Sequence, residues 1–318
     1  MEIQFTFFTI TTAIIKLFIL MLLGYVIYHK KFIDDKFTDM LGRLLVSIFF
    51  PALIISKTVD HFSFDKYPDW WYLPVAAFIF SAAALIIGAV VYKFLKGFDS
   101  KREFMCSAAF QNCGYLPMNL ILFSFSGEMR DRLLIYVFLY TLGFNVLVWS
   151  FVPLFFSGKM RDSLKLKVLL NPPVLAIVFS LLWVALKGEG GLPHLIADPI
   201  RQLGQAAFPI AMLTLGAYLS RYQAHNPGHK MSIAAVAAIK LFVFPALVLF
   251  VLTFFAFRPD YKFFLFLQSI MPTAVSLVFI SSYKGGDSDF LSGVIFYTHL
   301  IAVFSIPFWL MVYRFFFS

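Results

Sequence analysis

The sequence predicts an all-α polytopic membrane protein with ten transmembrane helices, arranged as two inverted five-helix repeats. Three observations lead to this fold class. First, 61% of the 318 residues are hydrophobic and only 14% are charged, whereas a soluble domain carries about 25% charged residues. Second, the apolar residues gather in stretches of membrane-spanning length. Third, the second half of the chain repeats features of the first.

The apolar stretches are separated by short polar connections, and about 20 apolar residues are enough to cross a bilayer. We expect spans at 7–29, 38–57, 70–95, 103–125, 132–157, 168–187, 197–221, 230–257, 261–283 and 289–315. The first stretch lacks a basic region before it and is too long for the core of a cleavable signal peptide. We therefore expect it to be the first permanent helix.

The two halves of the chain match at an offset of about 158 positions. Pro51 falls on Pro209, and Tyr140 falls on Tyr297. Each half holds five expected spans, and an odd number forces the second half into the membrane upside down. Inverted repeats are typical of secondary transporters, in which the substrate binds near the bilayer midplane where the repeats meet.

Positive charge is divided unequally between the two sides of the membrane. Connections after the odd-numbered spans hold about 14 Lys and Arg and the opposite side about 9, so the positive-inside rule places the odd connections in the cytoplasm. Both termini are then outside. The net charge of +9 lies mainly in these short connections, and no nucleic-acid motif accompanies it. We expect the bilayer, not a nucleic acid, as partner.

Two of the expected spans contain helix-breaking residues at mid-membrane. Asn112, Gly114 and Pro117 interrupt the fourth span, and Pro272 interrupts the ninth. Proline removes a backbone donor and glycine tolerates unusual backbone angles. The two interruptions fall at corresponding positions of the repeats, so we expect them to meet and to offer half-helix N-termini to an anion. A pair of ordinary proline kinks is the alternative.

Ionisable residues inside the expected spans are few. All seventeen acidic residues fall in connections or at span ends, which argues against a proton or sodium relay through a buried carboxylate. Lys16 and Lys240 lie in mid-span; each either favours an anionic substrate, or donates to broken-helix carbonyls or snorkels. His299 is either a titrating group or a packing residue. Tyr140 and Asn145 either face the break in span 4 or pack.

No metal site and no cofactor are predicted. His225 and His229 have a spacing that would suit a metal on a helix, but Pro227 and Gly228 lie between them. Proline and glycine break helices, so the pair is not expected to share a helix face.

Several motifs, in the same order along the chain, resemble the auxin efflux carrier family in its short bacterial form. They are LLGYVIYHKKFIDD at 22–35, LLVSIFFPALI at 44–54, NCGYL at 112–116, LGQAAFPIAMLTLGAYL at 203–219, KLFVFP at 240–245, MPTAVS at 271–276 and YKGGD at 283–287. The resemblance covers the whole chain. It implies a crossover fold like that of sodium–proton antiporters and bile-acid symporters, in which broken spans 4 and 9 cross.

The resemblance also implies that the chain is divided into a scaffold and a transport unit. Residues 1–68 and 159–228, holding spans 1, 2, 6 and 7, would form a scaffold that carries the dimer contact. Residues 69–158 and 229–318, holding spans 3–5 and 8–10, would form the transport unit. Members of the family move organic anions, such as auxin in plants and malate or malonate in bacteria.

By motif match, the resemblance places Asn112, Gly114, Tyr115 and Pro272 at the border of the substrate. Two departures from the bacterial pattern occur there. The proline after the NCGYL motif comes two residues early and Asn119 adds an amide, while Thr273 follows Pro272 where a second proline is common. Both departures lie at the expected site and affect the identity of the substrate.

The sequence therefore predicts a secondary transporter of a small organic anion, a homodimer in the cytoplasmic membrane that works by elevator-type alternating access. The predicted substrate-binding residues are Gln111, Asn112, Gly114, Tyr115, Pro117, Asn119, Pro272, Thr273, Ser276, Lys240 and Lys16. The predicted coupling residues are His299, Tyr140 and Asn145. The rival functions are an anion channel, a ligand sensor and an intramembrane enzyme, the last of which needs a nucleophile–base or metal constellation.

Overall fold

The computed structural model describes residues 7–95, 98, 100–157, 172–187, 191–221, 229–284 and 286–317. All regular elements in these residues are helices. The expected start of span 6 at 168–171 and the basic connections at 159–167 and 222–228 lie outside the described residues.

The first half of the chain forms helices that follow the expected spans. They are α1 (Phe7–His29), α2 (Asp35–Leu44), the π-helix η1 (Leu45–Phe49), α3 (Phe50–His61), α4 (Tyr72–Tyr92), α5 (Lys101–Ala109), α6 (Tyr115–Ser124) and α7 (Gly127–Ser157). The second expected span is divided into α2, η1 and α3, and the fourth into α5 and α6. Asp34 caps α2 with its carboxylate, which accepts a hydrogen bond from the Phe37 backbone N–H at 2.7 Å, as expected of an N-cap aspartate.

The second half of the chain is divided in a similar way. Its helices are α9 (Pro172–Lys187), α10 (His194–Arg221), α11 (Lys230–Ala238), the π-helix η4 (Ile239–Val243), α12 (Phe244–Phe254), α13 (Pro259–Ser269), α14 (Ser276–Lys284) and α15 (Ser288–Phe317). Among the described residues, six continuous helical stretches are long and apolar enough to cross a membrane: Asp35–His61, Tyr72–Tyr92, Gly127–Val148, His194–Arg221, Lys230–Phe254 and Ser288–Phe317. The chain is thus a polytopic helical membrane protein.

The two π-helical segments have a common local cause. Each precedes the tetrapeptide Phe-Pro-Ala-Leu, with Pro51 after η1 and Pro245 after η4. The Phe50 N–H donates to the Leu45 carbonyl and the Phe244 N–H to the Ile239 carbonyl, five residues back in both cases. Proline cannot donate and crowds the preceding turn, so the helix takes in an extra residue there. Such bulges are frequent at functional sites.

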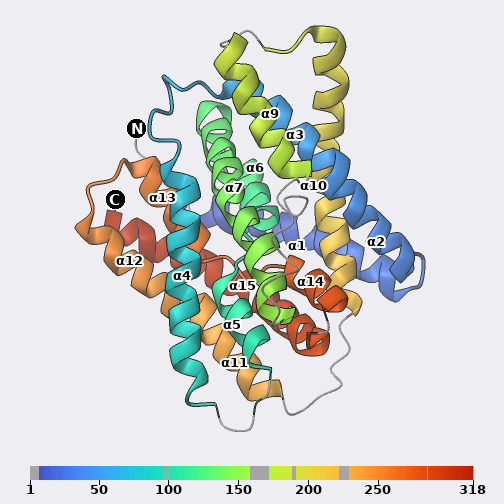
Figure 1. The fold of residues 1–318 in the computed structure, drawn as a ribbon, viewed down its shortest axis with the longest axis vertical. Helices are drawn as coiled ribbons and strands as arrows, with labels where there is room; N and C mark the ends of the chain where they lie inside the picture. Colours follow the sequence, from blue (N-terminus) through green and yellow to red (C-terminus); the bar gives the residue numbers. More distant parts are fainter. Residues whose placement is uncertain are drawn as a thin grey trace.

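Figure 1 shows how the helices are arranged. The closest helix pairs form two packing groups, which are also joined to each other by contacts of α1 with α15 and of α3 with α7. In one group, α1 packs along α10, and α3 packs against α9 and α10. In the other, α4 packs against α5 and α7, and α11 packs against α15. Small residues let the first group approach closely: a Cβ atom on Gly216 would lie 1.8 Å from the Met21 carbonyl oxygen, and one on Gly24 would lie 2.1 Å from the Leu213 carbonyl oxygen.

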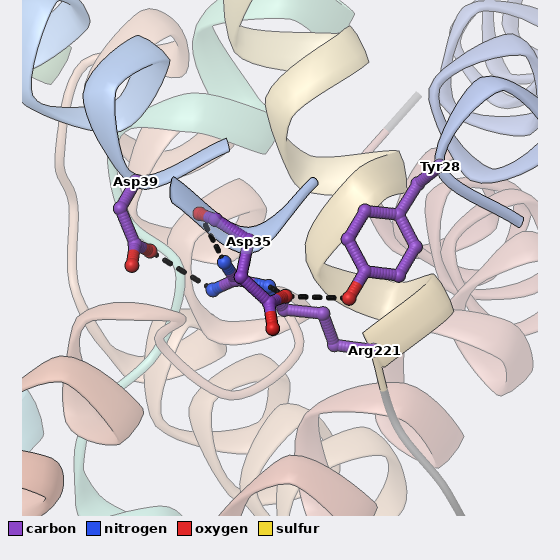
Figure 2. A pocket seen from close by; sticks show the side chains of 4 residues that line it. All are labelled: Tyr28, Asp35, Asp39 and Arg221. Carbon is purple, nitrogen blue, oxygen red and sulfur yellow. Dashed lines mark hydrogen bonds and ion pairs between the residues drawn. The ribbon is translucent and has the colours of Figure 1, made fainter. Parts of the chain in front are cut away.

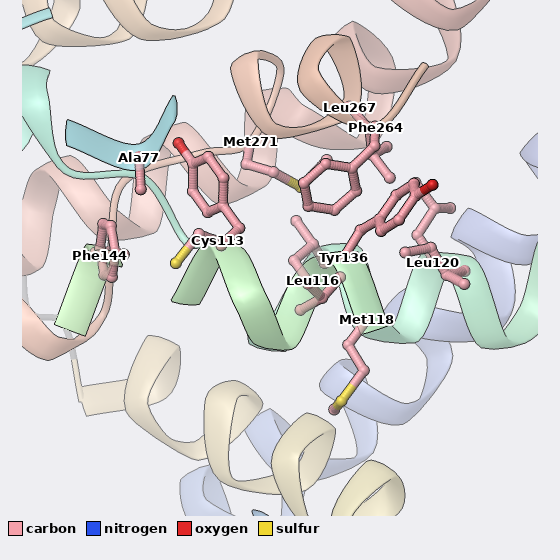
Figure 3. Packing of buried hydrophobic residues seen from close by; sticks show 14 of the residues in the cluster. Ala77, Cys113, Leu116, Met118, Leu120, Tyr136, Phe144, Phe264, Leu267 and Met271 are labelled. Carbon is pink, nitrogen blue, oxygen red and sulfur yellow. The ribbon is translucent and has the colours of Figure 1, made fainter. Parts of the chain in front are cut away.

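Apolar packing holds the shorter helices in place around the centre of the molecule. Figure 3 shows Leu116 and Leu120 of α6 beside Tyr136 of α7 and Phe264 of α13. All four side chains are buried. The position of α6 is therefore set by contacts with α7 and α13 as well as by its own sequence.

The predicted interruptions in spans 4 and 9 are confirmed. One helix stops at Ala109 and resumes at Tyr115, and the other stops at Ser269 and resumes at Ser276. Pro117 differs from the prediction, because it lies in the first turn of α6 and not in the break itself. An N–H in the first helical turn has no intrahelical acceptor, so proline is well tolerated there.

Candidate functional site

The two helix interruptions pair with each other through their backbones. The Asn112 N–H donates to the Pro272 carbonyl at 2.7 Å, and the Ala274 N–H donates to the Phe110 carbonyl at 2.9 Å. Between these bonds, Gln111 and Thr273 form an antiparallel bridge. We call residues 110–114 and 270–275 together the crossover. Backbone groups freed from two helices satisfy each other here, as they must at membrane depth.

The carbonyls at the end of α5 and in the break that follows it accept hydrogen bonds from several parts of the chain. Ser107 accepts a hydrogen bond from the Thr273 hydroxyl at 3.1 Å, and Cys113 accepts one from the Gln268 amide at 3.1 Å. The Ala108 and Ala109 carbonyls accept from the Lys240 ammonium at 2.9 and 3.3 Å. The broken end of α5 is thus closed by side chains from α13, its following break and η4.

The two mid-span lysines have different surroundings in the structure. Its ammonium donates to broken-helix carbonyls, and its side chain is 0% exposed. Lys16, by contrast, is exposed on α1, with its ammonium 5.7 Å from the centre of the Phe123 ring in α6. The structure therefore brings Lys240 to the crossover and leaves Lys16 apart from it.

Asn112 and His299 form a hydrogen-bonded pair at the crossover. The Asn112 Nδ2 and His299 Nε2 atoms are 3.2 Å apart, and His299 Nδ1 is 2.8 Å from the Ile295 carbonyl oxygen. A carbonyl only accepts, so Nδ1 carries the proton, and in a neutral imidazole Nε2 then accepts from Asn112. The Asn112 Oδ1 atom in turn faces the Leu116 N–H at 3.5 Å. Histidine orientation thus determines the direction of the Asn112 amide.

Gln111 and Tyr140 form the second polar pair. The Gln111 amide donates to the Tyr140 hydroxyl at 2.6 Å, and both residues are buried. Among the described residues, three buried amide oxygens have no hydrogen-bond partner: those of Gln111, Asn119 and Gln268. Buried acceptors of this kind need a donor from water or from a ligand.

The remaining predicted residues lie along the two resumed helices. Gly114 precedes α6, and a Cβ atom added to it would meet only the Thr141 methyl, at 3.7 Å. Tyr115 turns its ring to Phe50 of α3, with ring centres 4.7 Å apart, and the Asn119 amide donates to the Tyr115 carbonyl at 2.7 Å.

Two predicted residues take less part in the crossover than the others. Ser276 is the half-buried first residue of α14. Asn145 is half-buried on α7, five residues beyond Tyr140, and among the described residues no side-chain hydrogen bond joins it to the crossover.

Three contributors to the crossover are absent from the predicted set. Ser107 and Gln268 supply a carbonyl and an amide, and the Thr298 hydroxyl lies 3.4 Å from the Thr273 N–H as its acceptor. Gln268 is a polar residue in an apolar span beside Pro272, and Thr298 neighbours the repeated tyrosine at 297. Both signals are present in the sequence. Ser107 contributes its backbone, which no sequence pattern reveals.

Four half-helix ends meet at the crossover, and their partial charges cancel one another, so that Lys240 decides the net charge. α6 and α14 begin there, while α5 and α13 end there. Each end carries about half an elementary charge, positive at the N-terminus and negative at the C-terminus. Lys240 adds a cation beside α5, and the crossover itself contains no acidic residue. The electrostatic balance is therefore positive.

A surface pocket lies in a different part of the molecule (Figure 2). It is lined by Tyr28 of α1, Asp35 and Asp39 of α2, and Arg221 of α10. Arg221 pairs with Asp39 at 2.9 Å, and the Tyr28 hydroxyl donates to Asp35 at 2.5 Å. These charged groups are paired with one another, so we assign the pocket to holding three helix ends together.

The comparison with known proteins decides the family. The sequence profile described as "membrane transport protein" matches residues 9–161 and 156–310, nearly the whole chain. The chain belongs to this membrane transport protein family, the auxin efflux carrier family. The resemblance inferred from the motifs is thus confirmed.

Two relatives of this carrier-family protein illustrate the range of the family. An uncharacterized transporter of Methanothermobacter thermautotrophicus is 24% identical over 312 residues, which cover 95% of this chain and 98% of the relative. Protein PIN-LIKES 6 of Arabidopsis thaliana is 27% identical over 169 residues, covering 48% of this chain and 38% of the relative. Family and relatives together identify a membrane transporter and not an enzyme.

Proposed function

We propose that this auxin efflux carrier family member is a secondary transporter of a small organic anion, such as a mono- or dicarboxylate or an auxin-like acid. The observation that carries the proposal is the crossover, where two interrupted helices pair through Asn112 and Pro272. Paired broken helices at mid-membrane are the common architecture of substrate sites in secondary transporters.

The charge of the crossover supports an anion as substrate. Two half-helix N-termini and the Lys240 ammonium outweigh the two half-helix C-termini. In this proposal, Gln111, Asn112 and Thr273 supply polar contacts, while Lys240 contributes charge from behind the backbone. Tyr140 and His299 orient the two amides. Gly114, Tyr115, Pro117, Asn119, Pro272 and Ser276 line the edges of the site; Lys16 and Asn145 lie further away.

The burial of the crossover supports alternating access. Gln111 is 1% exposed and Asn112 is 3% exposed, so a substrate needs a rearrangement to reach them. The two packing groups supply a natural division: 1–68 and 159–228 would act as the scaffold, and 69–158 and 229–318 as the moving elevator. We also propose that the chain crosses the cytoplasmic membrane ten times, as two inverted repeats with both termini outside. The transporter would be a homodimer.

The test is counterflow in proteoliposomes with labelled malonate, malate and indole-acetate. We expect at least one acid to exchange. Asn112→Ala should lower its apparent affinity by about tenfold or more, since a buried polar contact is worth roughly 1–3 kcal/mol. Asn145→Ala is the matched control, an amide on α7 outside the crossover, and should leave affinity unchanged.

Other outcomes would redirect the assignment. Flux without counterflow indicates a channel, and binding without flux indicates a sensor. Wild-type affinity in Asn112→Ala would move the substrate site away from the crossover.

A further inference from the structure

Lys240 is a fully buried basic residue beside the crossover. Its side chain is 0% exposed, and it projects from the π-helix η4. The Nζ atom lies 2.9 Å from the Ala108 carbonyl oxygen and 3.3 Å from that of Ala109. Both acceptors are backbone oxygens at the C-terminal end of α5.

These two carbonyls have lost their helical donors. In an uninterrupted helix they would accept from the N–H groups of residues 112 and 113. Here the Asn112 N–H donates to Pro272 at 2.7 Å and the Cys113 N–H donates to Gln111 at 2.8 Å. The break therefore creates a buried pair of carbonyl oxygens at the negative end of a helix dipole, which is a cation-binding arrangement.

The ammonium has no carboxylate to balance it. The described ion pairs lie at helix ends, and none of them includes Lys240. Besides the two carbonyls, the Phe244 ring lies with its centre 5.8 Å from Nζ. A buried ammonium is costly unless its surroundings offer compensating contacts, and here backbone oxygens and an aromatic face supply them.

We propose that the Lys240 ammonium is a tethered cation, which takes the place that a mobile alkali-metal cation would otherwise occupy at the end of α5. The proposal deepens the proposed function, on which its consequence for transport rests: anion movement needs no sodium, because the cation at the crossover is covalently part of the protein. Removing the side chain should uncover a cation-binding cavity.

The first arm of the test measures the melting temperature of the purified protein in sodium-free choline buffer. Lys240→Ala removes three methylenes and the ammonium, so n-propylammonium matches the missing atoms. We expect the melting temperature of Lys240→Ala to be about 5 °C or more below that of the wild type. Propylammonium or sodium should restore at least half of the loss, while n-propanol, which lacks the charge, should not.

Two variants control this arm. Lys240→Met fills most of the space without a charge, so neither cation should stabilise it. Lys16→Ala removes the other lysine of the expected spans, which is exposed on α1, and should not acquire a response to propylammonium. Equal stabilisation of Lys240→Ala by propanol and by propylammonium would overturn the proposal, and so would an absence of any response to both cations.

The second arm measures transport. Wild-type counterflow should be equal in sodium and in choline, and the counterflow of Lys240→Ala should be lost in choline and regained with sodium or propylammonium. Sodium-dependent transport by the wild type would overturn the proposal. The arms separate the two hypotheses: without wild-type counterflow of any organic anion the proposed function fails, while the melting arm still decides whether Lys240 occupies a cation site.

Discussion

Single residues at the crossover make several hydrogen bonds. Asn112 uses its backbone N–H to bind Pro272, its Nδ2 to reach His299 and its Oδ1 to face the start of α6. His299 is tied to the Ile295 carbonyl through Nδ1. A side chain held at both ends by neighbours has its donors and acceptors oriented before a ligand arrives, which lowers the cost of binding.

The His299 contact leads to a prediction at this scale. His299→Phe removes the acceptor of Asn112 Nδ2 and leaves a buried donor unpaired, which costs roughly 1–3 kcal/mol. Under the proposed function we expect apparent substrate affinity in counterflow to fall about tenfold, with the fold retained. His299→Gln, which keeps an acceptor oxygen, should recover most of the affinity. Unchanged affinity in His299→Phe would show that Asn112 needs no orienting partner.

Helices in this protein are positioned by close backbone approach as much as by side-chain size. α1 and α10 meet through glycines on both partners, and α3 meets α10 at Gly204, where a Cβ atom would lie 2.9 Å from the Leu53 Cα. Lipid gives no hydrophobic drive for helix association, so dispersion contacts between closely packed backbones matter more. Such contacts tolerate no added atoms.

A pair of glycine substitutions tests this at the scale of the helix. Gly216→Ala would place Cβ 1.8 Å from the Met21 carbonyl oxygen, so α1 and α10 must move apart, at a cost of about 1–3 kcal/mol. We expect a lower melting temperature in detergent. Gly114→Ala is the control, since its Cβ would lie in ordinary contact 3.7 Å from Thr141. Equal stabilities of the two variants would contradict the close-packing argument.

Across the whole molecule, some ion pairs join the two packing groups and others join helices of the same group. Lys57 of α3 pairs with Asp131 of α7 at 2.9 Å, between the groups. Arg201 of α10 pairs with Asp60 of α3 at 2.9 Å, within one group. If the groups are scaffold and elevator, the first pair must break during transport and the second must not.

This difference makes the elevator proposal testable. Asp131→Asn weakens the pair that holds the present arrangement, and a partly exposed pair is worth about 0.5–1 kcal/mol, so we expect counterflow two- to fivefold faster with unchanged affinity. Asp60→Asn breaks the pair within one group and should leave the rate unchanged. The measurement is initial counterflow rate against substrate concentration. Equal effects of both variants would argue against relative movement of α3 and α7.

The sequence alone was sufficient for the membrane class, the family, the helix interruptions and most residues of the crossover. These features depend on local chemistry: apolar length sets where the chain crosses lipid, and Asn112 and Pro272 lie where a helix cannot continue. The sequence also predicted that the two breaks correspond, because they fall at matching positions of the two halves of the chain.

Only the tertiary structure decided which groups satisfy one another. The sequence does not distinguish Lys16 from Lys240, since both are lysines in apolar spans. Their difference arises because η4 delivers Lys240 to the open carbonyls of α5, whereas α1 leaves Lys16 exposed. Hydrogen bonds between residues more than a hundred positions apart depend on how helices pack, and packing is a property of the whole chain rather than of any segment.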